Sequence, residues 1–145
     1  MLGRFVSNLL GVRPPALQVG ALCLRQSDKK PEVLLVTSRG TGRWIIPKGW
    51  PMNGKSLAEA AAQEAWEEAG VKGRISDEAV GSYTYDKSEE DEAQRLVEVQ
   101  VFTLWVEGLK DDFPEASERK RKWFSPKEAA KLVAEKDLKA ILRSL

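Results

Sequence analysis

Three glutamates on one predicted helix are the residues of this sequence that most directly suggest chemistry. Glu64, Glu67 and Glu68 are spaced so that all three carboxylates share one patch of a helix surface. Like charges at this spacing destabilise an isolated helix by roughly 0.2–0.5 kcal/mol per pair. A divalent cation would offset that repulsion, and Mg²⁺ or Mn²⁺ prefers carboxylate and carbonyl oxygens. Taken alone the pattern is more typical of a solvated acidic face, so the surrounding sequence must decide.

The helix that carries these glutamates is clearly delimited. Ser56 and Glu59 have the form of a capping box, and Gly70 suits a helix end that needs a positive φ. The sequence therefore predicts a helix from about Leu57 to Ala69. The preceding loop, residues 47–56, contains two glycines and two prolines and can present backbone groups to a ligand. Small side chains form a stripe on which the helix can approach a sheet closely: Ala58, Ala62, Ala65 and Ala69.

Composition narrows the possible chemistry. The 145 residues include no histidine and one cysteine, which excludes Ser-His-Asp and Cys-His catalysis and His- or thiolate-ligated zinc. Carboxylates, lysines, backbone groups and hard cations remain. The net charge of +1 and the lack of a known binding motif argue against a nucleic-acid partner. Cys23 lies in an apolar stretch and is predicted to be buried and inert, which fits a reducing compartment.

Strands and helices are mixed along the chain, which predicts an α+β fold: an α/β/α sandwich with a mixed sheet flanked by helices. Residues 1–15 are predicted to be an N-terminal arm, and residues 16–145 a single domain. The arm lacks the features of a signal peptide, and no stretch is long enough to span a bilayer, so we expect a cytoplasmic protein. The predicted strands are 17–25, 32–39, 43–46, 79–85, 96–107 and 119–124, and the capping residue Ser125 precedes a helical region at 126–144.

The glutamates lie in a segment that resembles the Nudix box, G-x5-E-x7-R-E-U-x-E-E-x-G-U, where U is aliphatic. Gly49 matches the opening glycine, and the spacing holds without a gap to the closing Gly70 and Val71. Lys55 replaces the first glutamate of the box, and Gln63 replaces its arginine. That arginine is expected to pair with the glutamates, whereas Gln63 can hydrogen-bond but supplies no charge.

This resemblance extends over roughly residues 17–143 and implies a metal-dependent pyrophosphohydrolase. Glu64 and Glu68 would bind Mg²⁺ or Mn²⁺, joined by Glu67 and a backbone carbonyl near Lys48 and Gly49. All three glutamates are thus expected to be catalytic.

The general base implied by the resemblance varies within the family. Glu67 is the first expectation for the group that takes the proton of the attacking water. An acid of the loop at 86–92, such as Glu89 or Glu90, is the alternative.

A phosphate-rich substrate would also require cations from the protein. Basic residues flank the strand that leads into the box, and alternate residues of the run 119–122 share one face of a predicted strand. Trp50 lies beside the box and could stack on a base. The alternative for the basic run is an edge strand that its charges protect from aggregation. The expected substrate-binding residues are Arg39, Arg43, Lys48, Trp50, Arg119 and Arg121.

Two further segments, SRGTGRWIIPKG and RKRKWF, resemble the diphosphoinositol polyphosphate phosphohydrolase subgroup. Its members act on inositol pyrophosphates and on diadenosine polyphosphates. Those acting on inositol substrates tend to carry basic residues before the first strand, where this chain has Leu17, Gln18 and Val19. We therefore expect a small polyphosphate as the substrate, with dinucleoside polyphosphates favoured over diphosphoinositol polyphosphates. We expect a monomer or a homodimer.

A competing hypothesis is a Nudix-fold nucleotide-binding or regulatory module with weak or no turnover. The departures from the box at Lys55 and Gln63 motivate it. The intact Glu64, Glu67 and Glu68 argue against it.

Overall fold

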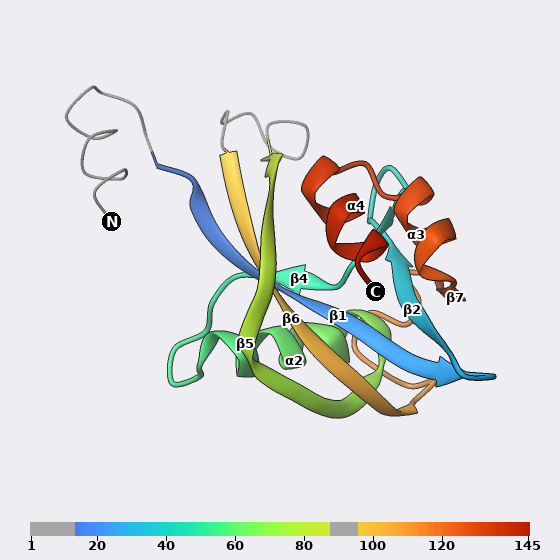
Figure 1. Ribbon diagram of the computed structural model, residues 1–145. Coiled ribbons are helices and arrows are strands. Elements are labelled where there is room, and N and C mark those ends of the chain that lie inside the picture. Colours follow the sequence, from blue (N-terminus) through green and yellow to red (C-terminus); the bar gives the residue numbers. More distant parts are fainter. Residues whose placement is uncertain (1–13, 88–95) are drawn as a thin grey trace.

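A computed structural model of the protein describes residues 14–87 and 96–145. Within these ranges one mixed sheet has the strand order β3-β2-β1-β6-β5, with β4 paired to β1 and β7 paired to β2 (Figure 1). The central strands β1 and β6 are parallel, and the other pairs are antiparallel. The strands are β1 (Ala16–Ser27), β2 (Lys30–Thr37), β3 (Trp44–Ile45), β4 (Lys48–Gly49), β5 (Val71–Asp86), β6 (Leu96–Leu109) and β7 (Arg121–Phe124).

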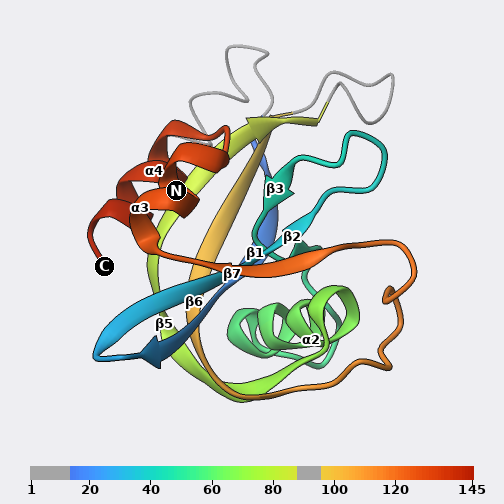
Figure 2. The same cartoon turned by 90° about the vertical axis from the view of Figure 1, so that its right-hand side faces the viewer.

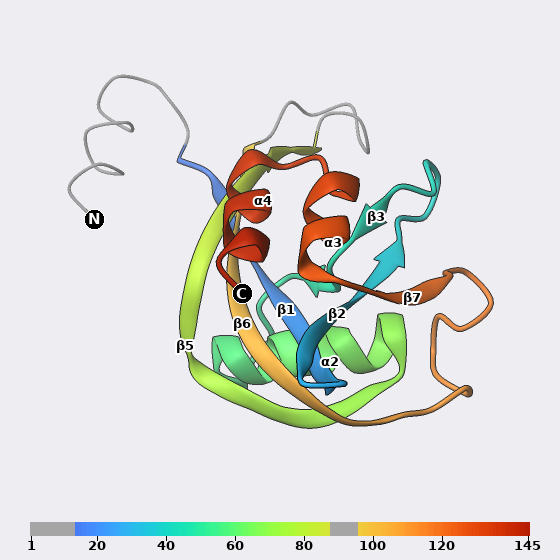
Figure 3. The same ribbon diagram turned by 45° about the vertical axis from the view of Figure 1, so that its right-hand side comes forward.

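Helices cover both faces of this sheet. Figure 3 shows α2 (Leu57–Ala69) on one side, and α3 (Pro126–Leu132) with α4 (Lys136–Arg143) on the other. Each side has its own apolar core: Leu22, Leu35 and Val99 pack toward α3 and α4, whereas the alanines of α2 pack on the opposite face. The predicted α/β/α sandwich is therefore confirmed.

Helix α2 has the predicted bounds and caps. The Ser56 hydroxyl accepts from the Glu59 backbone N–H at 3.1 Å, and the Glu59 carboxylate accepts from the Ser56 N–H at 2.7 Å. Gly70 follows the helix with a φ of 68°. Of the predicted alanine stripe, Ala62 is half-buried, and the alanines that α2 buries are Ala58, Ala60, Ala61, Ala65 and Ala69.

Several predicted boundaries were wrong. The strands predicted at 17–25 and 32–39 extend toward each other, and only Asp28 and Lys29 remain between them; both have positive φ, as in a tight two-residue hairpin. Strand β5 begins at Val71 rather than at residue 79, because its exposed first half pairs with β6 at the sheet edge without an alternating apolar pattern. The helical region at 126–144 divides into α3 and α4, and β7 begins at Arg121 rather than at residue 119.

The expected arm falls mostly outside the described residues, as do Glu89 and Glu90. Among the described residues, no helix is both long and apolar enough to cross a membrane.

Candidate active site

A cavity of about 740 Å³ lies where α2, β4 and the loop from β2 to β3 meet. Its volume is that of a small-molecule site. Glu67 and Arg121 are not among the described residues that line it. The predicted site residues that do line it are Arg39, Arg43, Lys48, Gly49, Trp50, Glu64, Glu68 and Arg119.

Two carboxylates of α2 form the floor of this cavity. Glu68 is buried, and the neighbouring Glu64 is half-buried. Burial raises the pKa of Glu68 to about 8, although Arg119 opposes this shift, and the neighbouring carboxylates Glu64 and Glu115 raise the pKa further. Burial also raises the pKa of Glu64. The site therefore disfavours the ionised forms of both carboxylates, and a positive charge beside them would reverse that preference.

Strand β4 holds the backbone of the segment before α2 next to these carboxylates. It pairs with β1 through Val19 opposite Gly49 and Gly20 opposite Lys48. The Lys48 backbone N–H donates to Glu68 Oε1 at 3.3 Å. A Cβ atom on Gly49 would overlap the Glu64 carboxylate, so this approach requires the glycine that opens the box.

Glu64 and Glu68 fit a hard divalent cation by their chemistry. Both are carboxylates, Glu68 is buried and Glu64 half-buried, and a cation would relieve their mutual repulsion. Glu67 is directed elsewhere: the Gln63 side-chain amide donates to Glu67 Oε2 at 2.8 Å. In the described part of the chain, accordingly, no three acidic side chains converge as a ready-made set of metal ligands.

Glu115 is a fourth acid at this site, and nothing in the spacing of the sequence indicated it. It lines the cavity from the connection between β6 and β7, which passes around α2 in Figure 2. Its backbone N–H donates to the Glu67 carbonyl at 3.0 Å, which fixes this connection to the helix. Its carboxylate accepts from Arg119 Nε at 2.8 Å.

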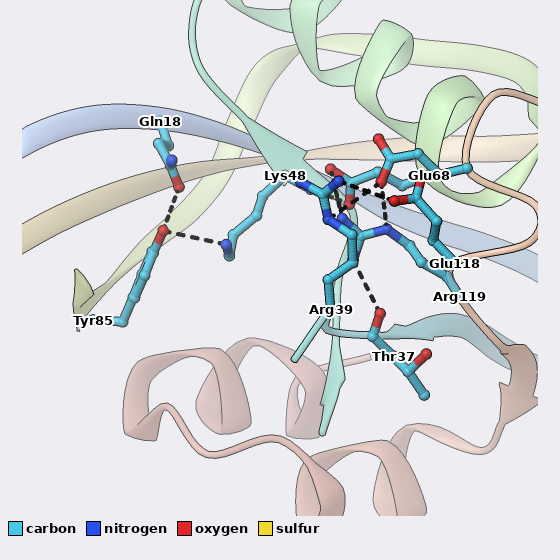
Figure 4. A network of polar contacts seen from close by, with 9 residues as sticks. Gln18, Thr37, Arg39, Lys48, Glu68, Tyr85, Glu118 and Arg119 are labelled. Atoms are coloured by element: carbon cyan, nitrogen blue, oxygen red, sulfur yellow. Dashed lines mark hydrogen bonds and ion pairs between the residues drawn. The ribbon is translucent and has the colours of Figure 1, made fainter. Parts of the chain in front are cut away.

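A polar chain of three residues forms the opposite wall of the cavity (Figure 4). The Tyr85 hydroxyl donates to Gln18 Oε1 at 2.8 Å, and Lys48 Nζ donates to the Tyr85 hydroxyl at 3.2 Å. Gln18 is only 4% exposed, so the end of this hydrogen-bonded series is held inside the protein. Gln18 and Tyr85 were missed as site residues because they are 67 positions apart in the sequence.

The loop from β2 to β3 supplies the predicted arginines. It is closed by hydrogen bonds from the Ser38 N–H to the Arg43 carbonyl at 2.8 Å and from the Gly42 N–H to the Ser38 carbonyl at 3.0 Å. Arg43 forms an ion pair of 2.9 Å with Glu135, whose side chain is only 7% exposed. The Arg39 side chain is 60% exposed and lies 3.3 Å from Glu118, so it can reorient toward a ligand.

Trp50 and Arg121 occupy different surroundings. Trp50 is 40% exposed at the cavity wall, and Lys87 Nζ lies 6.0 Å from the centroid of its ring. Arg121 donates to the carbonyls of Ala69 at 2.6 Å and Lys110 at 2.7 Å and pairs with Asp111 at 2.8 Å. Arg121 therefore links the C-terminal end of α2 to the connection that follows β6.

Comparisons with known proteins agree with this fold. "Nudix hydrolase 16, mitochondrial" of Arabidopsis thaliana is 36% identical over 107 residues, which cover 72% of this chain and 59% of that protein. "Diphosphoinositol polyphosphate phosphohydrolase 3-alpha" of Mus musculus is 35% identical over 119 residues, covering 80% of this chain and 68% of the relative. The crystal structure of a C. elegans Ap4A hydrolase has the same fold, with a TM-score of 0.65 and 22% identity over 90% of this chain and 95% of that one.

The arrangement of Gly49 against the α2 glutamates explains why the box keeps its spacing in this chain. The family model described as "NUDIX domain" matches residues 14–145, which is nearly the whole sequence. The chain therefore belongs to the NUDIX domain family.

Proposed function

We propose that this protein is a Mg²⁺- or Mn²⁺-dependent hydrolase that cleaves a diphosphate linkage in a phosphate-rich small molecule. The observation that carries the proposal is the pair of carboxylates Glu64, which is half-buried, and Glu68, which is buried; both line a cavity with basic residues on its walls. Relatives that are named as hydrolases, with 36% and 35% identity, support it.

The proposed roles follow from where each group lies. Glu64, Glu68 and a backbone carbonyl near Lys48 and Gly49 would hold the cation, with Glu67 close by on the same helix. When bound, the cation would neutralise phosphate charge and activate a water molecule. The Lys48 ammonium would be held at the phosphate chain by the Tyr85 hydroxyl.

The wider phosphate and base sites complete the proposal. Arg39 and Arg43 would contact phosphate oxygens from the loop above the cavity, and Trp50 would stack on a base. These side chains approach from elements different from the one that carries the glutamates. The chemistry and the substrate preference are thus assigned to separate parts of the chain.

The general base is assigned to a carboxylate next to the cation. Glu67 is the sequence-based prediction, and Glu115 is a second carboxylate that lines the cavity. The pH dependence of kcat, measured for E67Q and for E115Q, separates the two candidates. If one of these variants loses the fall of kcat at acidic pH, the residue it replaces is the general base. A variant that keeps this fall excludes its residue.

Dinucleoside polyphosphates are our preferred substrate class, ahead of diphosphoinositol polyphosphates. At the start of the first strand the cavity presents the neutral amide of Gln18, already bonded to Tyr85, where a highly phosphorylated ring would favour a cation. The exposed ring of Trp50 suits a nucleobase. The relative from Mus musculus is named for diphosphoinositol polyphosphates, and the C. elegans fold neighbour is named for Ap4A.

A Mg²⁺-dependent phosphate-release assay tests this function. It would use a panel of dinucleoside polyphosphates, nucleoside diphosphate derivatives and diphosphoinositol polyphosphates, with E68Q as the inactive control. The expected result is turnover of at least one dinucleoside polyphosphate that EDTA abolishes. No turnover of any panel member, together with tight binding of one, would instead establish the nucleotide-binding module that Lys55 and Gln63 suggested.

Location and assembly are further predictions from the sequence. We expect the protein in the cytoplasm and as a monomer or homodimer. Fluorescence imaging of the tagged chain and sedimentation velocity at micromolar concentration test these two expectations.

A further inference from the structure

The acidic cluster of this site lacks the positive charge that its family motif provides on the helix itself. Gln63 stands at the arginine position of the box, and its amide donates one hydrogen bond to Glu67 without adding charge. Meanwhile Glu64, Glu68 and Glu115 all line one cavity. Glu68 is buried, so its ionised form requires a positive charge nearby.

Arg119 lies where that charge is needed (Figure 4). Its side chain is only 8% exposed. Its Nε donates to Glu115 Oε1 at 2.8 Å, and its Nη2 lies 3.9 Å from Glu68 Oε2. Its Nη1 donates to the Thr37 carbonyl at 3.0 Å, which anchors the guanidinium at the end of β2.

We infer that Arg119 takes the place of the missing box arginine, and that it compensates and positions Glu68 and Glu115 from a different segment of the chain. The inference rests on the proposed cation site, because these acids are the groups that would surround the cation. It also changes the role expected for Arg119 from the sequence. A buried guanidinium bonded to a carboxylate and a backbone carbonyl is a positioning residue rather than a substrate contact.

Thermal unfolding in the absence of substrate provides the first test. R119Q should lower the Tm of the metal-free protein by about 5 °C or more. Mg²⁺ should then raise the Tm of R119Q more than it raises that of the wild type, because the cation replaces the lost charge. R119K keeps the charge and should retain most of the wild-type Tm.

R121Q is the matched control, since Arg121 lies two residues away and bonds to backbone carbonyls and Asp111 instead of the site acids. It should lower the Tm by the same amount with and without Mg²⁺. A double variant tests directly whether Arg119 replaces the box arginine. Q63R in the R119Q background places a positive charge on α2 and should restore the Tm of the metal-free protein.

Kinetics separate this role from substrate binding. R119Q should lower kcat with KM within about twofold of wild type, whereas loss of a substrate contact would raise KM. A wild-type response of R119Q to Mg²⁺, no rescue by Q63R, or a raised KM alone would overturn the inference. If wild-type protein shows neither turnover nor a Tm response to Mg²⁺, the proposed function fails. The metal-free comparison of R119Q with R119Q/Q63R still decides the inference in that case.

Discussion

Replacing Glu68 with glutamine tests the cation site most directly, because the change keeps the shape of the side chain and removes its charge. A unit charge about 4 Å from another contributes about 4 kcal/mol at an effective dielectric constant of about 20. The Glu68 side chain is 6% exposed, so solvent screens it little. E68Q should therefore lower kcat about a thousandfold, since 1.36 kcal/mol corresponds to about a factor of ten.

The same substitution should not weaken the fold. In the metal-free protein the ionised Glu68 is destabilised by burial and by its acidic neighbours. At pH 8 without metal, E68Q should therefore unfold at a Tm equal to or above that of the wild type, and Mg²⁺ should no longer raise it.

The assay pairs initial rates over a Mg²⁺ titration with thermal unfolding on the same preparations. Glu107 is an exposed glutamate of β6, and E107Q is the matched control, with rates within about twofold of wild type. Wild-type turnover by E68Q, or a large fall in its metal-free Tm, would refute the assignment of Glu68 to the cation.

Four further predictions follow from the contacts described above. The folded-state pKa of Glu68 lies above its ordinary value of 4.5, so its contribution to stability is present below about pH 4.5 and lost as pH rises through about 8; urea unfolding across this range should show the loss without metal but not with saturating Mg²⁺. G49A should reduce kcat by about a hundredfold or more in rate assays, because the new methyl group displaces Glu64. R121Q should cost about 2–3 kcal/mol of unfolding free energy in urea and leave KM unchanged, since its charged hydrogen bonds are structural. Burial raises the pKa of Cys23 to about 12, so a thiol reagent at pH 8 should label it only after unfolding, and rapid labelling of the native protein would contradict its burial.

The helix that carries the glutamates could be predicted almost completely from the sequence. Its caps are local: Ser56 bonds to a residue three positions away, and Gly70 ends the helix by its own backbone preference. The resemblance to the Nudix box likewise implied that Gly49 and Glu64 belong to one site, and the fold places them in contact. Signals within about one helical turn, or within one motif, needed no knowledge of the tertiary structure.

The parts that could not be predicted depend on long-range packing. Strand β4 has two residues and therefore no periodicity, yet it pairs with β1 about thirty positions earlier. Arg119 was expected to lie in a strand, but it precedes β7, and its guanidinium contacts Glu115 and the Thr37 carbonyl at the cavity. Neither Glu115 nor the Gln18–Tyr85 bond belongs to a pattern, because each becomes part of the site only when distant segments meet.

The two-residue strand β4 has a consequence for how substrate preference can change during evolution. It anchors the start of the segment that leads to α2, and the Ser56 cap anchors its end. Residues 50–55 between these anchors can accept substitutions without moving Gly49 or the glutamates. The family can thus acquire new substrates by changing a short stretch of chain while the residues that would hold the cation stay where they are.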